Sequence, residues 1–574
     1  MRRRRLRALK RRGMAIEAAR IGMSWGVQRL ASNFMARRNQ YATLSSRTLD
    51  RLLALNGRTE YGRRCGLDGA NPRRVFDQLP LSTYADYAPY VERLAAGEQN
   101  LLSSEPLVYF ASTSGTTGPQ KLIPVTRRQM LLNIRNLVMP FGLAIRQGIL
   151  KPVRSRAMVI LTEHSGGLTP GGVPKGAAIT GSFRYMGDII DSFLTAPGEV
   201  MRVHDQATAR YLQLLFALGE ERLSMILAFF PTMLLFTLRD LLTRHESLLR
   251  DLADGTLSEE LELSAAGRES LLRRLIRQPA RARTLAALLE RDQFNVAHIW
   301  PEVGAILTAS GGSFRFYIDQ LRPHLGGVPV YSPVYGASEA IIGIGYSVEE
   351  PYYLMLPSGT YVELVPVEDA DNPGARPIPA AQAKPGRCYE VVVTTLAGFT
   401  RYRMHDVVRV VGFQGQTPVI EFIERSGQVI DVLGEKTAEH HVVEAVERAC
   451  EAVKARVVDY FVAPDCEHTP ARYLLALEAW RDGGDHRDDV QRLVEVVEGA
   501  LRRSAPDYDE ERELGTLAPM TATLLKPGAF ERYRARRIAS GVSATQIKMP
   551  HAVPDPEFAR REFGHEILFQ VDAG

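Results

Sequence analysis

Apolar and polar positions along the first two thirds of the chain predict strands that alternate with helices. Short apolar runs typical of buried strands lie at residues 107–111, 157–161, 223–229, 303–307 and 328–331. Helical periods lie at residues 127–147, 205–218 and 269–289. This alternation predicts a largely parallel sheet with helices on both faces and with sites at the carboxyl ends of its strands. The loop after residue 111 is therefore expected at that edge.

The last third of the chain has a more mixed pattern. A β-forming run at 388–395 is followed by a turn that leads into 401–406, and then by a β run at 407–413. Beyond residue 436 the pattern predicts a helix at 439–453, strands at 455–462 and 472–478, a helix at 485–503, a strand at 520–525 and a helix at 530–539. These elements predict a compact α+β domain at the end of the chain.

Length and charge narrow the class of protein. A chain of 574 residues exceeds what one hydrophobic core organises, so two or more domains are expected. The net charge is +5, and the first 12 residues alone carry eight arginines and lysines, so the rest of the chain has a net charge of −3 (5 − 8). A body without excess positive charge argues against nucleic acid as a partner.

The cysteines and the N-terminus bear on location. Four scattered cysteines without a C-x-x-C pair argue against a disulfide framework or a zinc site, and a reducing cytoplasm is expected. Residues 1–35 begin with a basic run that no clean apolar segment follows, so they predict a basic extension and a surface helix rather than a signal peptide. Weak contact of this segment with an acidic membrane surface is the alternative. The apolar stretch at 226–236 is too short to span a bilayer.

The loop from Ser112 to Lys121 has the composition of a phosphate site. Gly115 and Gly118 lack Cβ atoms, so backbone N–H groups there can turn toward an anion, while the hydroxyls add donors and Lys121 adds a charge. The spacing differs from that of the common P-loop, in which four residues separate the glycines. The alternative is an ordinary surface turn rich in Gly, Ser and Thr.

Two further clusters follow predicted strands. The glycines Gly311 and Gly312 come after the strand at 303–307 and would let a flat ring approach the backbone. After the strand at 328–331, Tyr335 can stack on such a ring and Glu339 can hold a divalent cation near phosphate. Taken singly, Tyr335 is equally explained as a core aromatic side chain, and Glu339 as a solvated charge.

An aspartate precedes the β run at 407–413. Asp406 offers several acceptor positions and can bind two ribose hydroxyls at once. An ordinary turn aspartate is the alternative explanation.

Taken in order, five motifs resemble those of the acyl-adenylate-forming superfamily, which includes firefly luciferase and acyl-CoA ligases. They are Thr113–Lys121, Tyr335–Glu339, Tyr402–Asp406, Arg425 with Gly434–Lys436, and Gln546–Pro550. Within this superfamily the chain resembles the plant auxin-responsive, Gretchen-Hagen-type acyl-acid amido synthetases. The features that select this branch are Thr59–Tyr61, Pro89–Arg93, Lys121–Pro124, Tyr389–Thr395 and Gly541–Pro550. The similarity extends from about Leu52 to Val553.

The resemblance implies an ATP-dependent ligase. Such an enzyme joins a carboxylic acid to AMP with release of pyrophosphate, and then transfers the acyl group to an amino acid or amine. ATP and Mg²⁺ are the implied cofactors, and a monomer is expected. An acid–thiol ligase that loads CoA or a carrier protein is the alternative enzyme, and a binding protein that has lost its chemistry is the alternative outside catalysis.

The resemblance also implies roles for individual residues. The implied nucleotide-binding residues are Ser114, Gly115, Thr116, Thr117, Gly118, Lys121, Ser310, Gly311, Gly312, Tyr335, Gly336, Ala337, Asp406, Arg425 and Lys436. Glu339 is the implied Mg²⁺ ligand, and Ser338 is implied to lie near the α-phosphate. Lys548 is the implied catalytic lysine, which neutralises charge on the carboxylate and the α-phosphorus group. Preorganised positive charge of this kind is commonly the largest catalytic contribution.

The family pattern further implies a domain plan. After the extension at 1–35, a large α/β domain of mixed sheets flanked by helices is expected at 36–425, a hinge at 426–434 and a small, mobile α+β domain at 435–574. Three residues depart from the pattern. Ala337 stands where serine is frequent, which removes one hydroxyl from its loop. His405 stands where the family commonly has glycine, and either tunes Asp406 or packs outward. His551 stands where arginine is usual.

Overall fold

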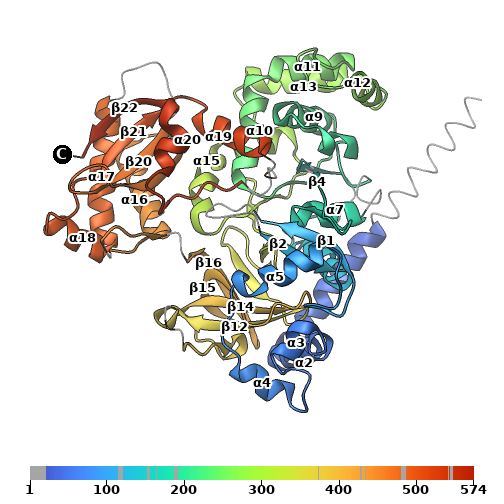
Figure 1. Cartoon of the computed structure of the whole chain (residues 1–574). Helices are drawn as coiled ribbons and strands as arrows, with labels where there is room; N and C mark the ends of the chain where they lie inside the picture. Colours follow the sequence, from blue (N-terminus) through green and yellow to red (C-terminus); the bar gives the residue numbers. More distant parts are fainter. Residues whose placement is uncertain are drawn as a thin grey trace, which may run out of the picture. The chain divides into compact units, whose positions relative to one another are not determined.

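A computed structural model describes residues 21–113, 121–151, 156–162, 165–186, 192–370, 372, 374–426, 429–433, 435–479, 487–540, 542 and 547–573. The chain divides into two compact units (Figure 1). The first comprises Met1–Met404 and Val408–Phe422, and the second comprises His405–Val407 and Ile423–Gly574.

A four-stranded parallel sheet lies within the first unit. Its strands, in spatial order, are β3 (Ala157–Ile160), β6 (Met225–Ala228), β7 (Ala305–Leu307) and β8 (Val330–Tyr331). All three strand pairs are parallel, and helices α9 (Gln206–Leu218), α10 (Pro231–Thr243) and α15 (Arg315–Leu325) lie in the intervening chain. The residues of β7 and β8 are buried, as continuous apolar strands covered on both faces should be. The predicted parallel sheet is therefore present.

The glycine-hydroxyl loop does not belong to that sheet. It joins β1 (Leu107–Ser112) to β2 (Leu122–Thr126), which pair antiparallel in a separate sheet with β5 (Pro174–Gly176) and β4 (Ser165–Leu168). A parallel partner would require a crossover of a dozen or more residues, and only nine separate these strands. The expectation that the loop follows a strand of the parallel sheet is wrong, because the connection is a hairpin.

An eight-stranded sheet makes up most of the rest of the first unit, although residues 405–407 and 423–425 of its strands belong to the second unit. In spatial order its strands are β13 (Ile378–Pro379), β12 (Thr360–Pro366), β14 (Cys388–Thr395), β15 (Tyr402–Gln414), β16 (Thr417–Arg425), β11 (Tyr352–Met355), β10 (Ile341–Gly345) and β9 (Val334–Gly336). Strand β15 begins earlier than the sequence predicts, so Asp406 lies within a strand rather than before one. The reason is a distant partner, because Ser82 exchanges backbone hydrogen bonds of 2.9 Å with Arg401 and Arg403.

Helices surround these sheets. Besides the helix at residues 21–36, the described part of the first unit also contains α2 (Tyr41–Asn56), α3 (Glu60–Arg64), α4 (Pro72–Gln78), α5 (Tyr84–Ala95), α6 (Arg127–Arg146), α7 (Ala178–Met186), α11 (His245–Asp254), α12 (Ala265–Leu272), α13 (Pro279–Glu290) and α14 (Val296–Ile299). The single helix predicted at 269–289 is divided between α12 and α13, because Pro279 occupies the first turn of a new helix.

The helix at residues 21–36 packs on α6. Ala31 is fully buried with Met139 and Leu143, and a Cβ on Gly142 would lie 2.0 Å from the carbonyl oxygen of Val27. Glycine at 142 therefore lets the two helices touch. None of the helices in the described ranges combines the length and apolar character needed to traverse a bilayer.

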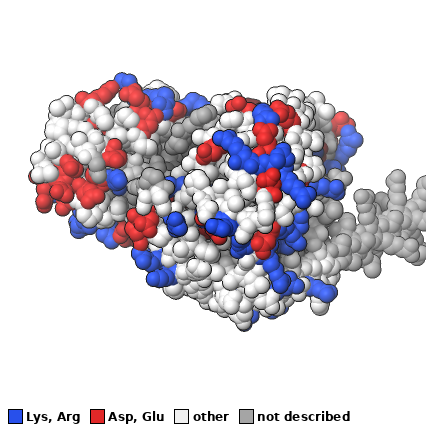
Figure 2. Space-filling view, turned by 60° about the horizontal axis from the view of Figure 1, so that its bottom comes forward, with Lys and Arg blue, Asp and Glu red and all other residues white. Residues whose placement is uncertain are grey.

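Charged side chains on the surface lie in mixed groups. Figure 2 shows acidic and basic residues interspersed on the face that it draws. The ion pairs of Arg93 with Glu60 (2.7 Å) and of Arg322 with Glu349 (2.9 Å) are typical. Exposed pairs of this kind contribute little stability.

The second unit is an α+β domain. Its main sheet has the order β19 (Val457–Asp465), β20 (Arg472–Ala479), β21 (Thr521–Leu525), β22 (Ile567–Asp572), and β17 (Val429–Ile430) pairs with β18 (Thr437–Ala438). Its helices are α16 (Glu439–Val453), α17 (Arg487–Ser504), α18 (Pro506–Glu513), α19 (Ala529–Ala539) and α20 (Phe558–Phe563). The bounds of α16 are those predicted, whereas α18, α20 and β22 were not foreseen.

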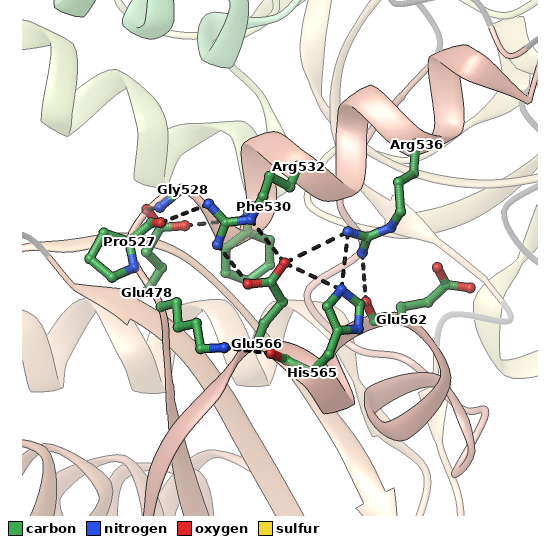
Figure 3. Close-up of polar contacts among 10 residues, drawn as sticks. Glu478, Pro527, Gly528, Phe530, Arg532, Arg536, Glu562, His565 and Glu566 are labelled. Carbon is green, nitrogen blue, oxygen red and sulfur yellow. Dashed lines mark hydrogen bonds and ion pairs between the residues drawn. The ribbon is translucent and has the colours of Figure 1, made fainter.

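A buried carboxylate ties α19 to the turn before β22 (Figure 3). Glu566 accepts hydrogen bonds from Arg532 Nε (2.9 Å) and Nη2 (2.6 Å), while Arg536 and His565 lie at 3.7 and 3.4 Å. Lys526 Nζ donates to the carbonyl of His565 at 2.8 Å. The hydrogen bonds from Arg532 hold the pKa of Glu566 below its ordinary value. These contacts stabilise the carboxyl-terminal part of the sheet.

We expect Arg532→Met to destabilise the second unit by about 1–2 kcal/mol at pH 7, since charge-assisted hydrogen bonds to a buried carboxylate are lost. A carboxyl with a lowered pKa stabilises the fold above its ordinary value of 4.5, and this contribution disappears as the pH falls through the folded pKa. The deficit should therefore shrink below about pH 4.5. Amide hydrogen exchange in β21 and β22 measures it.

Arg560→Met is the matched control. Arg560 is two-thirds exposed and binds the exposed side chains of Glu467 and Glu557, so its loss should cost less than about 0.5 kcal/mol. Equal losses in the two variants would contradict a special role for the Glu566 cluster.

Candidate active site

The loops after three parallel strands lie side by side. The N–H of Thr308, after β7, donates to the carbonyl of Tyr331 at 3.2 Å, and the N–H of Ala309 donates to the carbonyl of Phe229 at 3.3 Å. Ser310 is buried in the same loop. The glycines and hydroxyls that follow β7 thus lie at the carboxyl edge of this sheet, where sites in parallel sheets are expected.

Gly311 and Tyr335 both lie next to Phe422. A Cβ on Gly311 would lie 3.4 Å from Pro351 and 3.5 Å from the carbonyl oxygen of Phe422, so a side chain would crowd this loop. Gly312 has a φ of +57°, a conformation that favours glycine. The Tyr335 ring is 5.7 Å from Phe422 and 5.8 Å from Tyr353, and it is buried. Tyr335 is therefore a packed aromatic side chain next to the glycine loop.

Ser338 and Glu339 lie in the turn between β9 and β10. The N–H of Ala337 donates to the carbonyl of Ala340 at 2.9 Å and closes this turn. Gly336 pairs with Ile341, and a Cβ there would come within 2.9 Å of the Cα of Ile341. Glycine at 336 thus allows the tight hairpin that carries Glu339.

Glu339 is buried and has phenol neighbours. Its carboxylate accepts a hydrogen bond of 3.4 Å from the hydroxyl of Tyr402. Burial raises the pKa of Tyr84, and the negative charge of Glu339 adds to the rise. Lys121 Nζ lies 5.4 Å from the centre of the Tyr84 ring. Tyr84 therefore lies beside Lys121, which is predicted to serve the same nucleotide as Glu339.

The loop residues Ser114, Gly115, Thr116, Thr117 and Gly118 lie outside the described residues. The residues on either side of this loop, Thr113 and Lys121, are described and are hydrogen-bonded to each other. The N–H of Thr113 donates to the carbonyl of Lys121 at 3.0 Å, and the N–H of Lys121 donates to the hydroxyl of Thr113 at 3.3 Å. The phosphate-binding role of this loop stays a prediction.

The second unit holds the remaining predicted residues. Asp406 is buried, and its carboxylate lies 3.8 Å from Nε of Arg425, whose side chain is half exposed. The two predicted ribose-binding residues are therefore neighbours. Lys436 is exposed and has a φ of +42°, next to Glu435. Glu435 is buried and accepts from the N–H of Leu433 at 2.8 Å, which shapes the turn before Lys436.

Lys548 lies on a segment anchored to β19. His551 is fully buried, and its ring stacks on Tyr460 at 4.1 Å. Its carbonyl accepts from the N–H of Val462 at 2.8 Å, and its own N–H donates to Glu439 at 2.8 Å. Burial lowers the pKa of His551. This departure from the family pattern thus has a structural role, because a neutral ring fixes the chain three residues beyond Lys548.

His405 also has a structural explanation. Its φ is +60°, in the left-handed region that glycine adopts without strain, and its carbonyl accepts from the N–H of Ser426 at 2.6 Å. The backbone at 405 therefore explains why the family pattern has glycine here.

Several residues of the site carried no recognisable sequence signal. No motif contains Tyr84 or Phe422, and Tyr402 stands out only as part of the motif Tyr402–Asp406. Their contacts join separate segments of the chain, 63 positions apart for Tyr402 with Glu339 and 87 (422 − 335) for Phe422 with Tyr335.

Comparisons with known proteins define the class. Solved structures described as the GH3.15 acyl acid amido synthetase have the same fold, with TM-scores of 0.82 for the complex with 2,4-DB and 0.83 for a second structure. At 23% identity, they cover 94–95% of this chain, which covers 97% of theirs. The fold is thus that of an acyl acid amido synthetase, and the predicted fold class is confirmed.

The chain belongs to the GH3 family. The models of its N-terminal, central and C-terminal domains match residues 31–330, 353–425 and 440–557. The indole-3-acetic acid-amido synthetase GH3.8 of Oryza sativa subsp. indica is 28% identical over 544 residues, with 89% of this chain and 88% of the relative covered. The probable indole-3-acetic acid-amido synthetase GH3.2 of Oryza sativa subsp. japonica is 29% identical over 560 residues, with the same shares covered. The family resemblance inferred from the sequence is confirmed.

We expect His405→Gly to leave the stability unchanged or raise it by up to about 1 kcal/mol, because relief of the left-handed strain offsets the greater unfolded-state freedom of glycine. His405→Val should lower it by more than about 1 kcal/mol, since a β-branched residue tolerates this conformation poorly. Thermal unfolding of the two variants provides the measurement. A glycine variant less stable than the valine variant would show that the His405 side chain, rather than its backbone, sets the stability.

Proposed function

We propose that the protein is an ATP-dependent acyl-acid amido synthetase. A carboxylate oxygen attacks the α-phosphorus of ATP, the bond to the β-phosphate breaks, and pyrophosphate leaves. The nitrogen of an amino acid or amine then attacks the acyl carbon, the bond to AMP breaks, and a proton is lost to solvent. The observation that carries this proposal is the match of all three GH3 domains, in order, along one chain. The relatives are named as amido synthetases, as the predicted class of enzyme requires.

In this proposal the residues implied by the family resemblance bind the nucleotide. Lys121 and the loop before it bind the β- and γ-phosphates, while Ser310–Gly312 and Tyr335 border the adenine, with Gly336 and Ala337 next to it. Ser338 lies near the α-phosphate. Asp406 and Arg425 bind the ribose, and Lys436 contributes a further charge. Support comes from the joined loop ends, the crowded backbone at Gly311 and the Asp406–Arg425 pair.

The described residues fit a magnesium ion that arrives with ATP. Within the described ranges, no group of three or more His, Cys, Asp or Glu side chains is arranged to hold a metal. Glu339 supplies one buried carboxylate, and Mg²⁺ at phosphate sites takes one or two carboxylates and completes its shell with phosphate oxygens and water. When bound, the ion would neutralise phosphate charge during transfer.

Lys548 supplies the charge that lets two anions meet. A carboxylate and a triphosphate repel each other, and a cation placed between the reacting atoms lowers that barrier in a water-poor site. The segment that carries Lys548 is held by buried neighbours, Ile547 and Met549, and by His551. The hinge at 426–434, about which such a domain turns between the two half-reactions, stays a prediction from the sequence. A cytoplasmic location and a monomeric state stay predictions from the sequence.

The proposed reaction requires pyrophosphate release that depends on both ATP and an acid. A panel of carboxylic acids that includes indole-3-acetic acid, the acid named for the relatives, tests the first step. Mass analysis of the products with mixed amino acids or CoA tests the second. We expect an acyl amide; an acyl thioester would identify an acid–thiol ligase instead. A protein that bound no nucleotide and released no pyrophosphate with any acid would contradict the proposal.

Lys548→Ala should lower the rate of acid-dependent exchange of pyrophosphate into ATP by about 10²–10³, as removal of one preorganised charge commonly does. ATP binding, measured by calorimetry, should change by less than about threefold, because the remaining contacts to the nucleotide persist. Lys454→Ala, which removes the same charge at the end of α16, is the matched control and should leave both quantities unchanged. Exchange at the normal rate in Lys548→Ala would refute the role of the lysine.

A further inference from the structure

Helix α5 carries three tyrosines with a spacing of three residues. Tyr84, Tyr87 and Tyr90 lie close together on one side of the helix, because residues three apart are neighbours on a helical surface. The helix begins with a capping box, in which the N–H of Thr83 donates to Asp86 at 2.7 Å. This cap fixes the start of the helix. Each of the three hydroxyls then contacts a different part of the first unit.

Tyr84 holds the strand that follows the glycine-hydroxyl loop. Its hydroxyl donates to the carbonyl of Leu122 and accepts from the N–H of the same residue, both at 3.1 Å. Its ring lies next to Lys121. The Tyr84 hydroxyl thus fixes the position of Leu122, the first residue of β2.

Tyr87 holds the segment before β15. Its side chain is fully buried, and its hydroxyl accepts from the N–H of Thr400 at 2.8 Å and donates to the carbonyl of Thr400 at 2.9 Å. The hydroxyls of Ser82 (2.9 Å) and Tyr61 (3.2 Å) also lie within hydrogen-bond distance. Burial raises the pKa of Tyr87 to about 12, so this hydroxyl keeps its proton at neutral pH.

An aromatic stack extends from Tyr87 to Glu339. The Phe399 ring is 4.6 Å from Tyr87 and stacks on Tyr402 at 4.9 Å, with 26° between the ring planes. The hydroxyl of Tyr402 then donates to Glu339. Rings packed at these distances have little freedom to move independently, so the position of Tyr87 determines that of the Tyr402 hydroxyl.

We propose that α5 is the positioning element of the candidate site: Tyr84 fixes the strand that closes the glycine-hydroxyl loop, and Tyr87, through Phe399 and Tyr402, orients Glu339. The inference rests on the proposed function, because it assigns Glu339 to a nucleotide-bound cation. It also gives a role to Tyr61, in the motif Thr59–Tyr61, which the reaction itself leaves unexplained. Tyr61 lies on α3, and its ring packs on Tyr87.

Tyr90 provides a matched control on the same helix. Its hydroxyl accepts from Arg64 Nη1 at 3.0 Å, on the side of an open cavity of about 530 Å³ between α3 and α5. Tyr90→Phe therefore makes the same chemical change as Tyr87→Phe, but it removes a hydroxyl that contacts α3 rather than the candidate site.

The test measures binding without acid or turnover. Wild type and the variants Tyr84→Phe, Tyr87→Phe, Tyr90→Phe and Tyr402→Phe are titrated with a non-hydrolysable ATP analogue, and then with Mn²⁺ detected by electron paramagnetic resonance. Tyr402→Phe and Tyr87→Phe should weaken Mn²⁺ binding to the nucleotide complex about tenfold, the usual effect of removing a group that orients a metal ligand. Tyr84→Phe should weaken binding of the analogue without metal by about threefold to tenfold. Tyr90→Phe should change neither by more than about twofold.

The outcomes separate the inference from the function on which it rests. Wild type that binds neither the analogue nor Mn²⁺ overturns both. Wild type that binds both, with Mn²⁺ affinities unchanged in Tyr87→Phe and Tyr402→Phe, overturns the positioning role alone. Equal losses in Tyr87→Phe and Tyr90→Phe would also overturn it, because they would show a general need for the hydroxyls of α5. Glu339→Gln sets the scale, and its loss of Mn²⁺ affinity should be at least as large as that of Tyr402→Phe.

Discussion

The candidate site depends on holding charged side chains at fixed positions away from bulk water while leaving their charge available. Among the described contacts, phenols do much of this. Tyr402 bonds to the carboxylate of Glu339, and the ring of Tyr84 lies beside the ammonium group of Lys121. A phenol hydroxyl can position a carboxylate without adding an opposite charge. A close ion pair would hold the group equally well, but it would reduce the field that a polyphosphate or a cation experiences.

Charges elsewhere in the molecule are paired directly and have a structural role. Arg401 and Glu363 are both nearly buried and lie 2.9 Å apart, and Glu566 is bound twice by Arg532. In such pairs the mutual attraction offsets the cost of removing each charge from water. The first unit thus contains two kinds of buried carboxylate: Glu363 beside Arg401, and Glu339 beside a phenol in the candidate site.

Local patterns in the sequence predicted the elements whose partners are local. The strands of the parallel sheet and helix α16 follow from apolar runs and periodicity. The start of β15 did not, because Ser82 pairs with Arg401 and Arg403 across more than 300 positions. The motifs likewise located Glu339 and Asp406, but not Tyr84 or Tyr87, whose contacts arise only after the chain has folded. Tertiary pairing, rather than propensity, decided each of these cases.

The anchoring of residues 551–553 on β19 has a consequence for the entropy of the proposed reaction. A lysine on a frayed tail would have to be immobilised in every cycle, at about 1–2 kcal/mol for each residue that is ordered. Here the stacked His551 and the backbone bonds to Val462 order the adjoining chain when the second unit folds. The chain next to Lys548 is therefore ordered before any substrate binds, and less conformational entropy is lost when the lysine takes its place in the reaction.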